Sequence, residues 1–291
     1  MFIDIHAHTT RGRSIVELNG RQYMTTPEEL VKRYDQLGIE KAVLLPLVNP
    51  ENTPGIYQSN EEILQITRDF AGRFVPFCNV DPRARNHWQA PLNKILDCYR
   101  QAGFLGLGEV SANLPFLDAK VQNLFAAAEE NNFLLTFHIS PFLNYSYGLV
   151  DDSGLPQLEE SLRRFPKLRF LGHSQAFWAE ISTIRTVDDR FGYPTGPVTE
   201  GAVPRLLRQY PNLYGDLSAG SGYNALARDR EYAVKFLSEF QDRLLFGTDI
   251  CAPGTPTPLV DFLLELRSSG EISEVVFQKI ARGNAERLLA R

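Results

Sequence analysis

The chain has 291 residues, of which 43% are hydrophobic and 22% are charged, and its formal net charge is −5. This composition can build a large core and excludes an intrinsically disordered protein, while the acidic balance argues against a nucleic-acid-binding surface. No apolar run approaches the ~20 residues of a membrane span, and the N-terminus has no secretory signal pattern, so we expect a cytoplasmic protein, free of membrane segments, that binds a small molecule.

The first predicted element is a short apolar strand that ends in two histidines, His6 and His8. Residues i and i+2 face the same side of a strand, so the two rings are expected roughly 6.5 to 7 Å apart along one face. Imidazole nitrogens bind Zn²⁺, Fe²⁺ and Mn²⁺, and such an ion with an open position can make water nucleophilic near neutral pH. The pair indicates a site for a divalent cation, with a solvated surface pair as the alternative.

Helix and strand patterns alternate along the rest of the chain. Thr26-Pro27-Glu28-Glu29 is typical of a helix start, and Gly38 closes this helix. The apolar run that follows, 39–48, is typical of a strand buried on both faces. Further strands are expected at 74–80, 104–109, 134–139, 168–173, 213–217 and 244–248, and further helices at 59–70, 87–101, 121–131, 155–165, 203–210, 232–240, 259–268, 274–282 and 285–290. Eight strands alternating with helices predict a (β/α)₈ TIM barrel that forms a single domain over residues 1–291.

Two long connections follow strands of this barrel, at 140–154 and 174–199. Both leave the carboxyl ends of their strands, where barrel active sites lie, so we expect them to form walls or lids. They carry several aromatic residues, of which Tyr145 and Trp178 are candidate substrate contacts; Phe142, Tyr147 and Phe177 complete the set. Packing of the loops themselves is the alternative role.

Ionisable residues stand at the carboxyl ends of four further strands. Glu109 ends the fourth strand, His138 lies near the end of the fifth, His173 ends the sixth, and Asp249 follows the eighth. In a barrel these ends meet at one mouth, so the four side chains should converge with the two N-terminal histidines. The sequence thus predicts a metal site at the mouth; the alternative for Asp249 is a helix cap.

This order of motifs resembles the amidohydrolase superfamily, specifically its amidohydrolase-related branch, which also contains metal-dependent decarboxylases. The resemblance spans the chain and is carried by the strand-end residues, by Phe246-Gly247-Thr248-Asp249 and by the closing Ile280-Ala281-Arg282-Gly283-Asn284-Ala285-Glu286-Arg287-Leu288-Leu289. It implies that His6, His8 and His138 bind metal. It also implies that Asp249 ligates metal and shuttles a proton, and that His173 orients or deprotonates water or binds a second ion.

The predicted activity is hydrolysis of a C–N or C–O bond in a small amide, lactone or ester. The alternative is non-oxidative decarboxylation of an aromatic or unsaturated acid, and a third reading is a non-catalytic barrel that only binds. Zn²⁺ is the ion expected first, although Mn²⁺ suits the same ligands. The resemblance also bears on a second ion, because other members of the superfamily bridge two ions with a carbamylated lysine, and no lysine ends the fourth or fifth strand here. Glu109 is therefore the candidate bridge. In the competing arrangement His6, His8, His138 and Asp249 hold one ion, and Glu109 bonds to a ligand or to substrate.

Several residues carry less specific signals. Arg11 and Arg13 follow the histidine pair and are candidates for binding a substrate carboxylate, or else belong to a solvated loop. Asp216 can line the mouth, support a ligand or cap a helix. His87 is expected at a helix start on the surface, and Cys251 as a bystander near the metal. None of these patterns specifies the oligomeric state, and a homo-oligomer is compatible with them.

Overall fold

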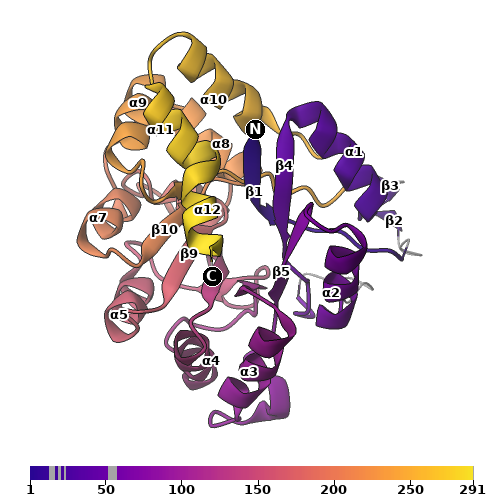
Figure 1. Cartoon of the computed structure of the whole chain (residues 1–291). Helices are drawn as coiled ribbons and strands as arrows, with labels where there is room; N and C mark the ends of the chain where they lie inside the picture. Colours follow the sequence, from indigo (N-terminus) through magenta and orange to yellow (C-terminus); the bar gives the residue numbers. More distant parts are fainter. Residues whose placement is uncertain (13–16, 19–20, 23, 52–57, 291) are drawn as a thin grey trace.

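Eight parallel strands form a curved sheet in the order β1-β4-β5-β6-β7-β9-β10-β11, seen in the computed structural model of Figure 1. The structure describes residues 1–12, 17–18, 21–22, 24–51 and 58–290. The strands are β1 (Phe2–Ala7), β4 (Ile39–Leu44), β5 (Phe74–Cys78), β6 (Gly106–Val110), β7 (Leu134–Ser140), β9 (Arg169–His173), β10 (Leu213–Asp216) and β11 (Leu244–Leu245). Outside this order, β8 (Leu149–Val150) pairs with β7, and β2 (Glu17–Leu18) pairs with β3 (Arg21–Gln22). The predicted (β/α)₈ barrel is confirmed.

The barrel is nearly closed because β1 meets the segment that follows β11. The Ile5 N–H donates to the Phe246 carbonyl at 3.0 Å, and the Asp249 N–H donates to the His6 carbonyl at 2.8 Å. β11 is shorter than the expected strand 244–248, since Gly247 and the positive φ of 55° at Asp249 interrupt the extended backbone. The interruption turns the Asp249 side chain away from a regular strand position.

A fully buried carboxylate, Asp4, reinforces this seam between β1 and the segment that follows β11. It accepts hydrogen bonds from the Thr248 N–H at 2.9 Å, from the Thr248 hydroxyl at 2.5 Å and from the Tyr34 hydroxyl at 2.7 Å. Burial raises the pKa of Asp4 to about 6, against the opposite effect of these hydrogen bonds. The carboxylate therefore ties the first strand, the first helix and the end of the last strand together.

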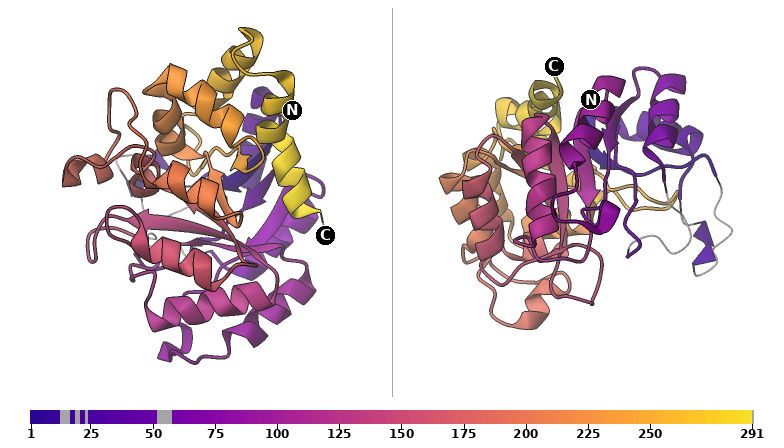
Figure 2. Two further views of the ribbon diagram at one scale, coloured as in Figure 1. Left: turned by 90° about the vertical axis from the view of Figure 1, so that its left-hand side faces the viewer. Right: turned by 90° about the horizontal axis from the view of Figure 1, so that it is seen from below.

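Helices cover the outside of the strands, as Figure 2 shows from two further sides. They are α1 (Pro27–Leu37), α2 (Asn60–Asp69), α3 (Leu92–Ala102), α4 (Ala119–Glu130), α5 (Pro156–Arg164), α6 (Gln175–Ala179), α7 (Ala202–Gln209), α8 (Ala219–Ala227), α9 (Arg230–Glu239), α10 (Pro258–Ser268), α11 (Glu274–Gln278) and α12 (Asn284–Leu289). Short 3₁₀ turns lie at Ala84–Asn86 and Val187–Arg190, and a π-helical turn at Lys279–Gly283 joins α11 to α12. α1 begins as predicted, with the Thr26 hydroxyl and the Glu29 carboxylate forming a capping box.

Three helices and one strand differ from the elements predicted from the sequence. α3 begins at Leu92 rather than near His87, because Pro91 occupies the N-cap position, and His87 lies in the exposed segment before it. α6 was expected to be part of a connection, and so was α8, whose glycines at positions 220 and 222 weaken any helical signal. β4 ends at Leu44 instead of 48, close to Pro46, which has no N–H to donate.

The core has two parts. The larger part lies between the strands and the helices, and the smaller part includes Ile5 and Leu171 from the strands and Leu288 from α12, which packs against the barrel (Figure 1). Phe177 and Trp178 belong to the larger part, and the Trp178 indole donates its N–H to the Asp216 carbonyl at 2.8 Å. Trp178 is only 1% exposed, so the prediction that it lines a substrate pocket is wrong.

Among the described residues, none of the helices has the length and apolar character needed to cross a membrane.

Candidate metal centre

His6 and His8 present their Nε2 atoms to each other at 3.1 Å at the mouth of the barrel. The ring centroids are 5.0 Å apart, closer than the roughly 6.5 to 7 Å expected from regular strand spacing. Each ring donates a hydrogen bond from Nδ1. His6 donates to Asp216 Oδ2 at 2.6 Å, and His8 donates to the Leu45 carbonyl oxygen at 2.7 Å. These bonds leave both Nε2 atoms facing the same point.

The next two histidines approach from β7 and β9. His173 is 2% exposed, its Nδ1 lies 2.8 Å from the Ser218 hydroxyl, and its ring lies 4.3 Å from that of His6. His138 donates from Nδ1 to Glu109 Oε1 at 2.6 Å and keeps 15% of its side chain exposed. His138 therefore contacts Glu109, which in turn faces His6 and His8, whereas the His173 ring lies directly beside the His6 ring.

Two carboxylates complete the cluster. Asp249 Oδ1 lies 3.3 Å from His8 Nε2 and 3.6 Å from His6 Nε2. Glu109 Oε2, the oxygen that His138 does not occupy, lies 3.9 Å from the same two nitrogens. Asp249 keeps 24% of its side chain exposed, so it is the member of the cluster most open to solvent.

Close backbone approach allows Glu109 and His173 to reach these places. Gly108 precedes Glu109 with a φ of 137°, and a Cβ atom there would lie 2.5 Å from the Thr136 carbonyl oxygen of β7. Gly172 precedes His173, and a Cβ atom there would collide with the Phe177 ring. A side chain at either position would push β6 or β9 out of place, which explains the glycine before each of these residues.

The donor set fits a divalent cation. Ligand atoms about 2.1 Å from an ion in tetrahedral or octahedral geometry are roughly 3.0 to 3.4 Å apart, and the separations among His6, His8 and Asp249 are close to this range. A second set, His6, Glu109 and His173, also has its ligand atoms within 4.8 Å of one another. Both sets share one nitrogen, His6 Nε2. Because that nitrogen has one lone pair for a metal, the two sets describe one centre.

The histidines and the carboxylates of the centre shift one another's pKa, so that positive and negative charges partly cancel. Burial opposes protonation of His6, but Asp216, Asp249 and Glu109 raise its pKa to about 10. Burial likewise opposes ionisation of the acids, yet His138 lowers the pKa of Glu109 to about 2 together with His6 and His173. His8, His6 and His173 hold the pKa of Asp249 well below its usual range. Without an ion, a proton on His6 therefore offsets part of the negative charge, and a bound cation would replace it.

His173 has a different ionisation. Burial and the nearby positive charge of His6 lower its pKa to about 4, although Asp216, Glu109 and Asp249 act in the opposite direction. At neutral pH this imidazole is uncharged. The proton shared with the Ser218 hydroxyl then decides whether His173 Nε2 presents a lone pair or an N–H to the centre.

The remaining sequence candidates lie at different distances from the centre. Arg11 is exposed, and its guanidinium pairs with Asp69, so the structure does not bring it to the centre; Arg13 lies outside the described residues. Tyr145 is exposed and lines a cavity that His138 also lines. Asp216, only a weak candidate from sequence, directly supports His6, and its place at the carboxyl end of a predicted strand, the last residue of β10, was the signal for it.

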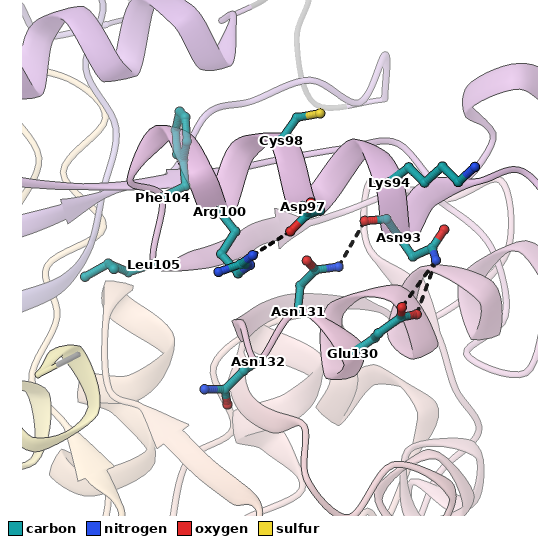
Figure 3. A pocket seen from close by; sticks show the side chains of 10 residues that line it. All are labelled: Asn93, Lys94, Asp97, Cys98, Arg100, Phe104, Leu105, Glu130, Asn131 and Asn132. Atoms are coloured by element: carbon teal, nitrogen blue, oxygen red, sulfur yellow. Dashed lines mark hydrogen bonds and ion pairs between the residues drawn. The ribbon is translucent and has the colours of Figure 1, made fainter.

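Two cavities on the protein are large enough for a small molecule, and only one of them lies beside the centre. One, of about 380 Å³, lies beside the centre between the connections that follow β7 and β9 and includes His138 in its wall. The other, of about 770 Å³, lies along α3, beside the end of α4 and the residues just before β6 (Figure 3). Its side chains largely bond to each other, as in the pairs Arg100–Asp97 and Asn93–Glu130. Since it lies where β6 begins, away from the strand ends with the cluster, the chemistry belongs to the first cavity.

Solved structures of low sequence identity share the whole fold. A Burkholderia multivorans amidohydrolase with bound zinc is 17% identical, with a TM-score of 0.64 over 100% of this chain and 99% of that chain. A probable 2-pyrone-4,6-dicarboxylic acid hydrolase from Acinetobacter baumannii, with citric acid bound, is 12% identical, with a TM-score of 0.59 over 100% and 99%. A 5-carboxyvanillate decarboxylase from Sphingomonas paucimobilis is 17% identical, with a TM-score of 0.60 over 99% and 98%.

No curated protein sequence matches the chain. The amidohydrolase family model, in contrast, matches residues 3–291, which include every histidine and carboxylate described above. The match agrees with the resemblance seen in the motifs and with the barrel that gathers them. The protein belongs to the amidohydrolase family.

Proposed function

We propose that this chain is a metal-dependent hydrolase that uses water to cleave a C–N or C–O bond in a small amide, lactone or ester. The observation that carries the proposal is the convergence of two buried imidazole Nε2 atoms, 3.1 Å apart, with two carboxylates that each lie within 3.9 Å of both nitrogens. We take residues 1–291 as one catalytic domain. Zn²⁺ is the ion we favour, since a similar barrel holds zinc, and Mn²⁺ suits the same donors. The three unpaired cysteines suit a cytoplasmic location.

His6, His8 and Asp249 would hold the ion, with Glu109 as a fourth ligand and His138 bonded to Glu109. When bound, a divalent cation supplies positive charge that acidifies water and polarises a carbonyl group. Asp249 takes the proton from water through its exposed carboxylate and returns it to the leaving group. His173, uncharged at neutral pH, stays beside it as a hydrogen-bond partner for water or for a developing oxyanion.

Decarboxylation of an aromatic or unsaturated acid is the second candidate. The observation behind it is the decarboxylase among the similar barrels. The same cluster suits both reactions, because Asp249 would deliver its proton to a ring carbon instead of a leaving group. The two reactions differ in their use of water, since hydrolysis consumes a molecule of water and decarboxylation releases carbon dioxide without adding oxygen to the product.

Isotope labelling separates the two reactions. The metal-loaded protein is incubated in ¹⁸O-water with a panel of lactones, cyclic amides, esters and hydroxylated benzoic acids. Hydrolysis predicts one labelled oxygen in the acid product and no carbon dioxide from the substrate. Release of carbon dioxide with an unlabelled product would replace the proposal by its alternative, and turnover of none of the panel would contradict both.

Replacing Asp216 by asparagine is expected to weaken metal binding about 10- to 100-fold while leaving the barrel folded. The amide is nearly isosteric, but it loses the negative charge that orients the His6 ring and makes it a better ligand. Metal affinity is measured by titration with a competing chelator. Asp261→Asn, on the exposed face of α10, is the matched control. Equal affinities for the wild type and Asp216→Asn would exclude a supporting role for Asp216.

Replacing Glu109 by glutamine tests the number of ions and the fourth ligand. Because the two ligand sets share His6 Nε2, we expect the wild type to bind one equivalent of metal. We expect Glu109→Gln to bind one equivalent at least about tenfold more weakly, since an uncharged amide replaces a carboxylate ligand. Calorimetric titration of the apo-protein gives both numbers, with Glu130→Gln as the control. Unchanged affinity in Glu109→Gln would remove Glu109 from the metal site, and two equivalents in the wild type would make it a bridge.

A further inference from the structure

The side chains that line the cavity beside the metal centre are almost all uncharged. Its volume is about 380 Å³, and its wall includes the aromatic rings of Tyr145, Tyr147 and Phe191. The Tyr147 ring lies 4.4 Å from the ring of His138, which bonds to Glu109, so the cavity adjoins the centre. No acidic side chain belongs to the wall that the structure describes. A group bound there meets mainly apolar surface and neutral polar atoms.

The one permanently charged side chain of the described wall, Arg190, does not offer its charge to a ligand. It is only 4% exposed, and its Nε and Nη2 atoms are closed off from solvent. Its Nη1 donates to the Asp151 carbonyl at 2.9 Å, and Glu180 Oε1 lies 3.5 Å from its Nε. A carboxylate placed in this cavity would therefore lose hydration without gaining a cation, which is unfavourable.

Gln175 is the amide side chain of the wall, and it is free to bond to a ligand. The residues from 170 to 182 are all buried except Gln175, so the cavity is where this stretch of chain is open. Its side chain makes no hydrogen bond to a residue that the structure describes. The Ser146 hydroxyl, in contrast, is bonded to the Ser140 hydroxyl at 3.0 Å. The Tyr145 hydroxyl has no described partner either, but its ring is 58% exposed.

The local structure fixes the backbone of Gln175. It is the first residue of α6 and directly follows Ser174, whose hydroxyl accepts from the Phe177 N–H at 3.2 Å and from the Ile139 N–H at 3.1 Å. Phe177 is packed in the core, so the start of the helix is held between β7 and the core. The side chain of Gln175, two residues after His173, is thus presented to the cavity from a rigid element.

We propose that Gln175 binds a neutral polar group of the substrate, a carboxamide or a hydroxyl, and that the part of the substrate in this cavity carries no charge. A glutamine amide offers two N–H donors and one carbonyl acceptor, so it matches such groups without a charge of its own. The inference rests on the proposed function, since it narrows the substrate of that centre to molecules that are uncharged away from the scissile bond. The competing role for Gln175 is that of a solvated surface residue.

Binding of benzamide, and of benzoate as its charged analogue of nearly the same shape, tests the inference on metal-free protein, where neither ligand can bind through an ion. Ligand-observed NMR titration gives both dissociation constants for each variant. We expect the wild type to bind benzamide at least about fivefold more tightly than benzoate. Gln175→Met keeps the length of the side chain and removes its hydrogen-bonding groups. It should weaken benzamide binding at least about fivefold and leave benzoate binding within about twofold of the wild type.

Gln89→Met is the matched control. Gln89 is an exposed glutamine in the connection after β5, and its side chain makes no hydrogen bond to a described residue, so this variant should bind both ligands like the wild type. Gln175→Lys gives a second readout, because it brings a cation to the cavity, and it should bind benzoate at least about fivefold more tightly than the wild type does.

Unchanged benzamide affinity in Gln175→Met overturns the inference, as does equal weakening of both ligands, which is the result expected of a structural role. Absence of benzamide binding, or equal binding of both ligands, in the wild type also overturns it. If Gln175→Met does not fold, Gln175→Lys decides, and unchanged benzoate affinity is then the contrary result. The labelled-water experiment tests the proposed function separately. Benzamide selectivity without hydrolysis removes the hydrolase proposal alone, and hydrolysis without an effect of Gln175 on binding removes this inference alone.

Discussion

Removal of the metal by a chelator is expected to abolish activity, and added Zn²⁺ or Mn²⁺ to restore it. The positive charge that acidifies water and polarises the scissile group comes from the ion, and no described side chain of the centre replaces it. With the ion gone, His6 holds a proton because Asp216, Asp249 and Glu109 raise its pKa to about 10, and a proton shared in this way cannot polarise a substrate carbonyl as an ion does. Turnover before and after reloading is the measurement.

The same experiment should show that the apo-protein stays folded. Its stability comes from the apolar layers inside and outside the barrel and from the hydrogen bonds of the strands, none of which involves the ion. The circular dichroism spectrum should therefore be unchanged and the thermal transition still cooperative. Full activity in protein that elemental analysis shows to be metal-free would contradict the proposed mechanism, and an unfolded apo-protein would show that the ion has a structural role.

Asparagine in place of Asp249 is expected to lower kcat about 100-fold or more without loss of the fold. An amide of nearly the same shape can neither accept the proton of water nor return it to a leaving group, and losing a positioned acid–base group costs this much. The change also removes one charged ligand, so metal affinity must be measured and kcat determined at saturating metal. KM should change less than kcat, because the proton moves in the transition state.

Asp152→Asn provides the control for this substitution. Asp152 is an exposed carboxylate in the connection after β7, so the change removes the same charge without touching the centre. Its kcat should stay within about twofold of the wild type. A near-normal kcat in metal-saturated Asp249→Asn would mean that Asp249 serves only the backbone turn, where its N–H donates to the His6 carbonyl.

The barrel could be predicted from sequence because each of its units is local. An apolar run such as 39–48 and a capping pattern such as Thr26–Glu29 are complete within a few residues. The regular alternation of such units then leaves one arrangement for the carboxyl ends of the strands. That is why His6, His8, Glu109, His173 and Asp249, read only as strand-end residues, meet at one mouth in the structure.

Contacts between distant parts of the chain could not be predicted in the same way. The bond between His6 and Asp216 spans 210 positions, and no spacing rule distinguishes Asp216 from an acid that caps a helix. Trp178 was predicted to contact substrate but is buried in the core. An aromatic residue in a long connection has the same sequence signature in a pocket wall and in a core.

The seam between β1 and the end of β11 bears on how the protein is made. His6 and His8 precede Asp216 and Asp249 by more than 200 positions in the chain, so they are synthesised well before the two carboxylates that orient and complete the centre. Asp4 likewise waits for Thr248 before it can join the two ends of the sheet. The complete set of candidate ligands therefore comes together only when the ring of strands closes.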